Sequence, residues 1–209
     1  MNEASHPQWL KWAREIQAIG QTGLHYAEQE YDRQRYGRLV SLASEIMAAH
    51  SQAEAASLER IFLQQNGYAT PKVDVRGAVF RDDKLLMVRE RTDGYWSLPG
   101  GWADVNEKPS AMIEREIREE SGFHARARCL VGVYEANHDQ EPIDVFHAYK
   151  LLFLCDIVAG EAQTSYETSE VGFFTLDDLP PLSTSRTQMR YIRDAQACLR
   201  DMTLPAVFD

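Results

Sequence analysis

The chain has 209 residues and a formal net charge of −10, so it is long enough for one full domain and a smaller second one. The acidic balance argues against a surface that follows nucleic-acid phosphates, and more weakly against a membrane surface. The apolar run Leu151–Val158 suits a buried strand and is too short for a membrane span. Charged residues interrupt Trp9–Ile19, so we expect no signal peptide. Three cysteines without a CxxC pair predict ordinary thiols in a reducing cytoplasm: Cys129, Cys155 and Cys198.

Residues 1–67 are predicted to form a small all-α N-terminal domain. Apolar residues keep helical spacing from Trp9 to Ile19 and again from Tyr36 to Met47. A third helix is predicted by the capping-box pattern Ser51–Glu54, with apolar residues behind it. Glycine and proline both interrupt helices, so the segment 67–71 is the expected linker.

Residues 68–209 are predicted to form an α/β domain. Apolar residues alternate with polar or small ones from Val73 to Val79, as in a strand. Further strands are expected at Lys84–Arg89, Cys129–Tyr134, Phe146–Ile157 and Val171–Thr175. The segment Thr184–Leu199 is expected to be a closing helix. Strands interleaved with helices predict a sandwich around a mixed sheet.

A glutamate-rich helix is predicted from Pro109 to Ser121. Proline suits the first helical turn, and the following Gly122 suits the left-handed residue that ends a helix. At ~100° per residue, three glutamates fall on one face: Glu116, Glu119 and Glu120. Because like charges repel, the cluster needs a counter-charge, and Mg2+ or Mn2+ with oxygen ligands is the natural one. Taken alone, three such glutamates more often form a solvated helix face.

The residues around this helix favour a functional site. Arg115 is placed to pair with Glu107 or Glu119 and to hold a carboxylate in place. The pair Gly100–Gly101 precedes the helix and allows the backbone to approach a ligand closely.

The segment Gly101–Phe123 fits the pattern Gly-x5-Glu-x7-Arg-Glu-U-x-Glu-Glu-x-Gly-U at every specified position, where U is a bulky apolar residue. An accidental match has odds on the order of one in a million. This pattern is the signature of the Nudix hydrolases, which the chain resembles. The resemblance implies an α/β/α sandwich with a mixed sheet, and it implies that the Gly100 carbonyl is a metal ligand. One departure is Asn106, where the family commonly has glycine; Asn tolerates left-handed backbone.

Phrases outside the signature extend the resemblance over most of the chain. They include Trp96–Trp102 and Glu167–Phe174, and they resemble a bacterial Nudix subgroup with an N-terminal helical domain. The resemblance to this subgroup implies hydrolysis of CDP-choline and related nucleoside diphosphates, or of ADP-ribose. CDP-alcohols are placed ahead of ADP-ribose on this resemblance alone.

The expected mechanism is metal-assisted attack of water on a diphosphate. The expected Mg2+ ligands, with Mn2+ able to substitute, are Glu116, Glu119, Glu120 and the Gly100 carbonyl. The base stays open between a glutamate of the signature, Glu119 or Glu120, and a loop carboxylate, Glu170 or Glu167. Arg115 completes the predicted catalytic set.

Each candidate substrate-binding residue has a functional and a structural interpretation. Arg76 and Arg89 are candidate phosphate ligands because arginine presents a planar fork of donors, but surface or edge-strand charges would look the same. Trp96 and Trp102 are candidate stacking partners of a base, although aromatic residues beside a turn are more often packing residues.

The main functional prediction is therefore a Mg2+-dependent pyrophosphohydrolase of nucleoside diphosphate derivatives. The alternatives are a ligand sensor that has lost catalysis and a hydrolase of RNA ends or caps. Residues 1–67 hold six Lys/Arg against eight Asp/Glu, which does not suit a nucleic-acid reader, so nucleic acid is an unlikely partner. The aromatic surplus of this module, including Trp9, Trp12 and Tyr36, predicts a homodimer formed through it. The alternatives are that the module shapes the substrate pocket or that these residues pack on the α/β domain of their own chain.

Overall fold

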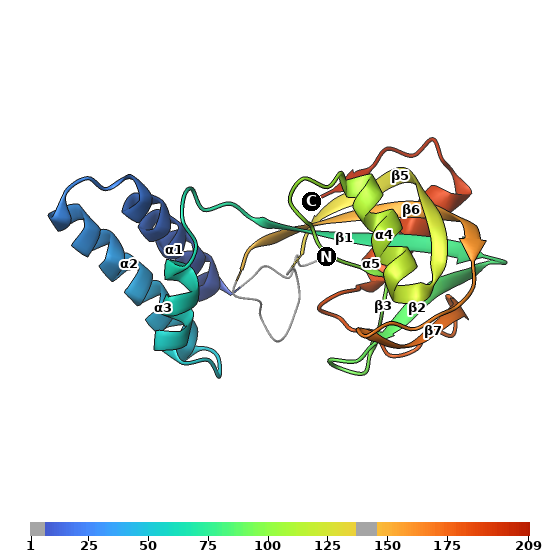
Figure 1. The fold of residues 1–209 in the computed structure, drawn as a ribbon, viewed down its shortest axis with the longest axis horizontal. Helices are drawn as coiled ribbons and strands as arrows, with labels where there is room; N and C mark the ends of the chain where they lie inside the picture. Colours follow the sequence, from blue (N-terminus) through green and yellow to red (C-terminus); the bar gives the residue numbers. More distant parts are fainter. Residues whose placement is uncertain (1–6, 137–145) are drawn as a thin grey trace. The chain divides into compact units, whose positions relative to one another are not determined.

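A computed structural model of the chain describes residues 7–136 and 146–209, and these fall into two compact units (Figure 1). The first unit is helical and holds the N-terminal residues through Pro71, together with Phe146 and His147. The second begins at Lys72 and contains the sheet. The linker predicted at 67–71 thus groups with the helices, and the sheet begins directly after it.

The helical unit consists of α1 (Gln8–Tyr26), α2 (Glu30–Ala49) and α3 (Ala55–Leu63). Its core is made by one apolar face of each helix: Leu10, Ala13, Val40, Met47, Leu58 and Phe62. The predicted capping box is wrong. Helix α3 has Glu54 as its N-cap residue, and the Ser51 hydroxyl instead accepts a hydrogen bond from the Ala53 N–H at 3.2 Å.

Phe146 also belongs to this helical core. Its ring lies edge-on to Phe62 with 6.1 Å between centroids, and its carbonyl accepts a hydrogen bond from Arg14 at 3.1 Å. The strand predicted from Phe146 therefore begins later, at Ala148. Periodicity alone could not show this, because Phe146 is apolar in either setting.

The second unit is built on one mixed sheet in the order β3-β2-β1-β6-β5-β8, with β4 paired to β1 and β7 paired to β2. The strands are β1 (Lys72–Arg81), β2 (Lys84–Glu90), β3 (Trp96–Ser97), β4 (Gly100–Trp102), β5 (Phe123–Glu135), β6 (Ala148–Gly160), β7 (Thr168–Thr175) and β8 (Val207–Phe208). Strands β1 and β6 run parallel, whereas β5 and β6 run antiparallel. The predicted mixed sheet is confirmed.

Two helices cover the sheet, α4 (Pro109–Ser121) and α5 (Met189–Arg200). Neighbouring residues of β2 belong to different cores: Leu85 and Met87 pack with α5, and Leu86 packs with α4. Because successive side chains of a strand point to opposite faces, the two helices lie on opposite faces of the sheet. The closing helix begins five residues later than predicted, since Thr184, Ser185 and Arg186 form a turn before it.

Candidate active site

Helix α4 runs from Pro109 to Ser121, as predicted. Proline occupies its first turn, and Gly122 ends it in the left-handed conformation with φ 79°. A Cβ at this glycine would lie 2.4 Å from the Glu161 carbonyl oxygen, so no other residue fits. Asn106 also has a left-handed backbone, with φ 66°, and so provides the conformation that a glycine would have supplied.

Strand β4 brings the Gly100–Gly101 turn against this helix. The Gly100 N–H donates a hydrogen bond of 2.9 Å to the Glu120 carboxylate, which is only 4% exposed. Gly100 has φ 137°, and a Cβ there would lie 2.0 Å from the Val75 carbonyl oxygen. Gly101 faces Glu116, since its Cβ position is 3.7 Å from that carboxylate. Two glutamates of α4 thus meet the backbone of the turn.

Burial raises the pKa values of both carboxylates. It raises the pKa of Glu120 to about 8, and the negative charges of Glu90 and Glu116 act in the same direction. Burial likewise raises the pKa of Glu116, against the opposing effect of Arg115. A cation beside both groups would offset the cost of keeping them ionised. The carboxylates and the adjacent Gly100 carbonyl are hard oxygen donors, so the residues present fit Mg2+ or Mn2+.

Arg115 gathers the remaining carboxylates. Its Nε and Nη2 atoms donate to Glu107, with Nη2 2.8 Å from Oε2. Its Nη1 atom donates to Glu116 at 2.8 Å and to Glu119 at 3.0 Å, and Nη2 also reaches Asp104 at 2.9 Å. Within the described ranges, no three His, Cys, Asp or Glu residues converge on one metal position.

The candidate bases lie in different settings. Glu119 is half exposed beside Arg115. The negative charge of Glu167 contributes to the raised pKa of Glu116, which places Glu167 near the helix. Glu170 is ion-paired with Arg89 at 2.6 Å, on directly opposed positions of β7 and β2. Thr168 ties β7 to α4 by donating 2.8 Å to the Glu120 carbonyl.

The four predicted substrate residues lie on two pairs of neighbouring strands: Arg89 of β2 is directly opposite Trp96 of β3, while Arg76 and Trp102 come from β1 and β4. Arg76 is buried and bonded to Asp74 and to the Leu98 carbonyl, a placement that does not support the predicted phosphate contact. Arg89 is half exposed and holds Glu170 and the Gly94 carbonyl. Trp96 packs edge-on against Phe174, with 4.7 Å between centroids. Trp102 is 50% exposed and available for stacking.

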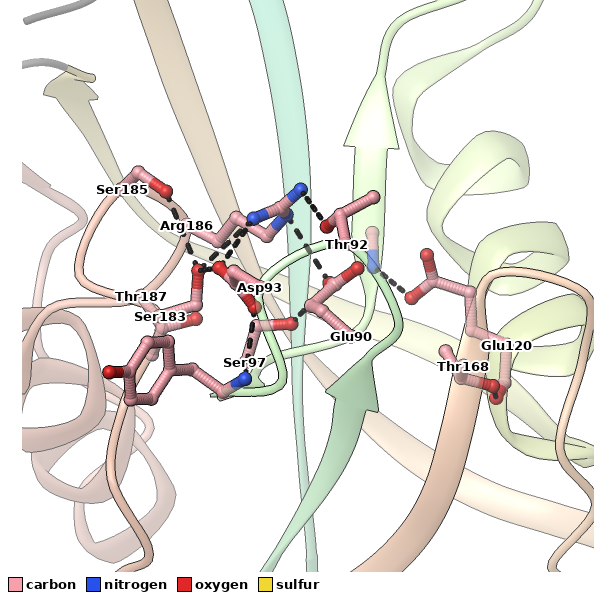
Figure 2. Close-up of polar contacts among 12 residues, drawn as sticks. Glu90, Thr92, Asp93, Ser97, Glu120, Thr168, Ser183, Ser185, Arg186 and Thr187 are labelled. Atoms are coloured by element: carbon pink, nitrogen blue, oxygen red, sulfur yellow. Dashed lines mark hydrogen bonds and ion pairs between the residues drawn. The ribbon is translucent and has the colours of Figure 1, made fainter. Parts of the chain in front are cut away.

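The sequence did not indicate a polar network in which Arg186 joins the end of β2 and the connection that follows it (Figure 2). Arg186 donates to Asp93 at 3.0 Å and to the Thr92 hydroxyl at 3.1 Å, and it lies 3.4 Å from Glu90. Ser97 donates 2.7 Å to Glu90. Three partners of Arg186 are more than 90 residues away along the chain, namely Glu90, Thr92 and Asp93, so no local pattern could have revealed them.

Comparison with known proteins shows which protein family the chain belongs to. Residues 70–195 match the model of the NUDIX domain, and residues 7–62 match the model described as "UDP-X-like, N-terminal oligomerisation domain". The chain therefore belongs to the Nudix hydrolases. Its helical unit further places it with those members that carry this N-terminal domain.

Several relatives match along much of the chain. A Bacillus subtilis protein named "Putative ADP-ribose pyrophosphatase YjhB" is 37% identical over 202 residues, 97% of each chain. A crystal structure of a UDP-X diphosphatase shares 31% identity and a TM-score of 0.62, covering 96% of this chain and 98% of that one. An ADP-ribose pyrophosphatase from Streptococcus suis shares 36% identity and a TM-score of 0.61, covering 67% of this chain and all of that one.

In the two described ranges, no helix is long and apolar enough to cross a membrane.

Proposed function

We propose that this protein hydrolyses the diphosphate of a nucleoside diphosphate joined to a second moiety, with Mg2+ as the working metal and Mn2+ able to replace it. The observation that carries the proposal is the buried Glu120 carboxylate on the Gly100 turn, with Glu116 facing Gly101. These two carboxylates and the Gly100 carbonyl are hard oxygen donors of the kind that would hold Mg2+ or Mn2+, and such a cation would neutralise the charge of a diphosphate.

The names of the relatives support this substrate class. Two of the proteins described above are named as ADP-ribose pyrophosphatases and one as a UDP-X diphosphatase. We therefore place ADP-ribose first among the candidate substrates, ahead of CDP-choline and other CDP-alcohols. The expected products are a nucleoside monophosphate and a phosphorylated second moiety.

We assign metal-binding and orienting roles to the residues of this site. Glu116, Glu120 and the Gly100 carbonyl would hold the metal, with Glu119 joining them when it turns from Arg115. When bound, the metal lowers the pKa of a water molecule and neutralises charge on the phosphate. Arg115 orients Glu116 and Glu119 and limits their mutual repulsion.

The general base is proposed to be Glu119 or Glu167. Glu120 is less suitable as the general base for two reasons. Its carboxylate is buried, and it already accepts a hydrogen bond from the Gly100 N–H. Glu170 is engaged with Arg89, so it would have to break that ion pair before it could accept a proton. Replacing each of the four glutamates in turn by Gln, and following the pH profile of turnover, separates a base from a metal ligand.

A panel of substrates tests the proposal. Purified protein would be incubated with ADP-ribose, CDP-choline, UDP-linked sugars, nucleoside triphosphates and capped RNA, in Mg2+ and in Mn2+. Product identification in 18O water would show which phosphorus is attacked. Cleavage of a diphosphate-linked substrate that is lost in Glu120→Gln supports the proposal. Exclusive cleavage of triphosphates or capped RNA contradicts it, and binding of ADP-ribose without cleavage would identify the sensor alternative.

The helical unit is proposed to form a homodimer. Its family model is described as an oligomerisation domain, and several of its aromatic side chains are exposed: Trp12, Tyr26, Tyr31 and Tyr68. Large aromatic residues remove much area from water when an interface forms. Trp9 is less available than predicted, because its ring stacks on His50 with 4.4 Å between centroids. The free thiols of all three cysteines suit the proposed cytoplasmic location.

A further inference from the structure

The peptide units of Leu98 are held from two sides by buried side chains. The Leu98 N–H donates 2.8 Å to the Thr187 hydroxyl, and its carbonyl accepts 3.1 Å from the Arg76 guanidinium. Leu98 and Thr187 are fully buried, and Arg76 is 4% exposed. Leu98 lies two residues before Gly100, so these two bonds act on the turn that meets Glu120.

These contacts belong to a closed ring. Arg76 forms a bidentate pair with Asp74, with contacts of 3.0 and 2.9 Å. Asp74 lies 3.6 Å from the Lys150 ammonium, which in turn donates 2.7 Å to the Arg186 carbonyl. Arg186 is the chain neighbour of Thr187, which returns the ring to Leu98. The ring therefore joins β1, β6 and the turn before α5 through the two peptide groups of Leu98.

The ring is braced from outside by the Arg186 side chain (Figure 2). Its guanidinium binds Asp93 and the Thr92 hydroxyl, in the connection between β2 and β3. The Ser183 hydroxyl binds the same Asp93 carboxylate at 2.7 Å. The turn that carries Thr187 is thus fixed to two other segments and cannot slide without breaking several polar contacts.

The residues that follow Leu98, up to the turn at Gly100, are also held by hydrogen bonds. The Pro99 carbonyl accepts 2.9 Å from the Gly77 N–H, and the Gly100 N–H donates 2.9 Å to Glu120. The backbone groups from Leu98 to Gly100 therefore have polar partners on β1, on α4 and in the turn before α5. Loss of the Thr187 hydroxyl would free the Leu98 N–H at the start of this series.

We propose that Thr187 is a positioning residue of the metal site: its hydroxyl fixes Leu98, and through the buried ring it sets the place of the Gly100 carbonyl and of Glu120. Thr187 is fully buried, so we assign it no contact with substrate. The proposal rests on the assignment of Gly100, Glu116 and Glu120 to the metal in the proposed function. A hydroxyl with a purely structural role would affect stability but leave metal affinity unchanged.

The test compares Thr187→Val, which keeps the shape without the hydroxyl, with Thr187→Ser, which keeps the hydroxyl. Mn2+ binding to the full chain is measured by electron paramagnetic resonance, and backbone amide exchange at Leu98 and Gly100 by NMR. We expect Thr187→Val to weaken Mn2+ binding by about 10- to 100-fold, the usual range for partners that orient metal ligands. Its two amides should exchange faster and kcat should fall, with KM little changed. Thr187→Ser should keep Mn2+ binding, amide exchange and kcat close to the wild-type values.

Wild-type Mn2+ affinity in folded Thr187→Val overturns the proposal, whatever its melting temperature. If Thr187→Val does not fold, Lys150→Met tests the same ring from the Arg186 carbonyl, with the same expected loss of affinity. Ser44→Ala serves as a matched control, because it removes a buried hydroxyl from α2. Mn2+ binding that is lost in Glu120→Gln but kept in Thr187→Val rejects the positioning role alone. Failure of the wild type to bind Mn2+ rejects the metal site and the proposed function with it.

Discussion

Arg115 and Glu107 form a two-pronged ion pair, with Nη2 2.8 Å from Oε2 and Nε 3.1 Å from Oε1. This pair fixes the guanidinium that also contacts Glu116 and Glu119. The pKa of Glu107 is lowered chiefly by its hydrogen bond with Arg115, so Glu107 stays ionised at neutral pH. The contact links the segment before α4 to the helix face that carries the proposed metal ligands.

Glu107→Gln should lower kcat by roughly 10-fold, because a loosened guanidinium no longer orients Glu116. Asp104→Asn is the matched control. Asp104 contacts the same Nη2 atom, but its side chain is 72% exposed, so we expect a change of less than about 2-fold. Steady-state kinetics of both variants provide the measurement. Equal losses in the two would show that Glu107 has no special part in orienting Arg115.

Changing Glu116 or Glu120 to Gln should lower turnover by at least ~100-fold, because each change removes a proposed metal ligand while keeping its shape. Both variants should stay folded by circular dichroism. In the absence of metal, Glu120→Gln should melt no lower than the wild type, since it replaces a carboxylate that is costly to bury. Near-wild-type turnover in both variants would remove these residues from the site.

Lys150 should impose a pH dependence on stability. Burial lowers its pKa to about 8 from 10.5, with Asp74 opposing and Arg76 and Arg186 adding to the shift. Above the folded value the native state has released a proton that the unfolded chain still binds, so rising pH favours the native state until 10.5. Below pH 8 both states bind the proton and the contribution is constant.

Urea unfolding of the wild type and Lys150→Met isolates this effect. The difference in free energy of unfolding, wild type minus variant, should rise by roughly 1–3 kcal/mol between pH 8 and pH 10.5. The groups that titrate equally in both proteins cancel in the difference. A difference that stays flat or falls over that range would show that the buried amine keeps an ordinary pKa.

Light scattering should report a dimer for the full chain at micromolar concentration. Trp12→Ala should shift the equilibrium toward monomer, because this side chain is 57% exposed in the helical unit. Phe208→Ala removes an exposed aromatic residue of the other unit and should leave the mass unchanged. A monomeric full chain, or a dimer that survives deletion of residues 1–71, would exclude the helical unit as the dimerisation element.

Phe146→Ala should destabilise the helical unit by about 2 kcal/mol, because it removes the edge contact with Phe62 and part of the helical core. Thermal melting followed by circular dichroism would measure it. Leu130→Ala, a change at a partly exposed residue of β5, is the control and should cost less. An unchanged melting temperature in Phe146→Ala would place Phe146 outside the helical core.

The local features of the site could be predicted from the sequence because they depend on short-range rules. Helix α4 follows from a proline, a glycine and a 3.6-residue period, and the shared face of Glu116, Glu119 and Glu120 follows from the same period. The strands of the mixed sheet were found where apolar residues alternate or run together. The short strands β3, β4 and β8 were missed, since two or three residues show no period.

Only the tertiary structure decided which distant groups meet. The sequence could not show that Arg76 is committed to Asp74 and Leu98, because the burial of an arginine depends on the whole sheet. It also could not show that the Sγ atoms of Cys129 and Cys198, 69 residues apart in the chain, lie 3.3 Å from each other. Nor could it join Thr187 to Leu98, since hydrogen bonds between remote segments leave no periodic trace. The sequence by itself determined the helix and the shared face of its three glutamates; the packing of the sheet decided what holds the Gly100 turn against them.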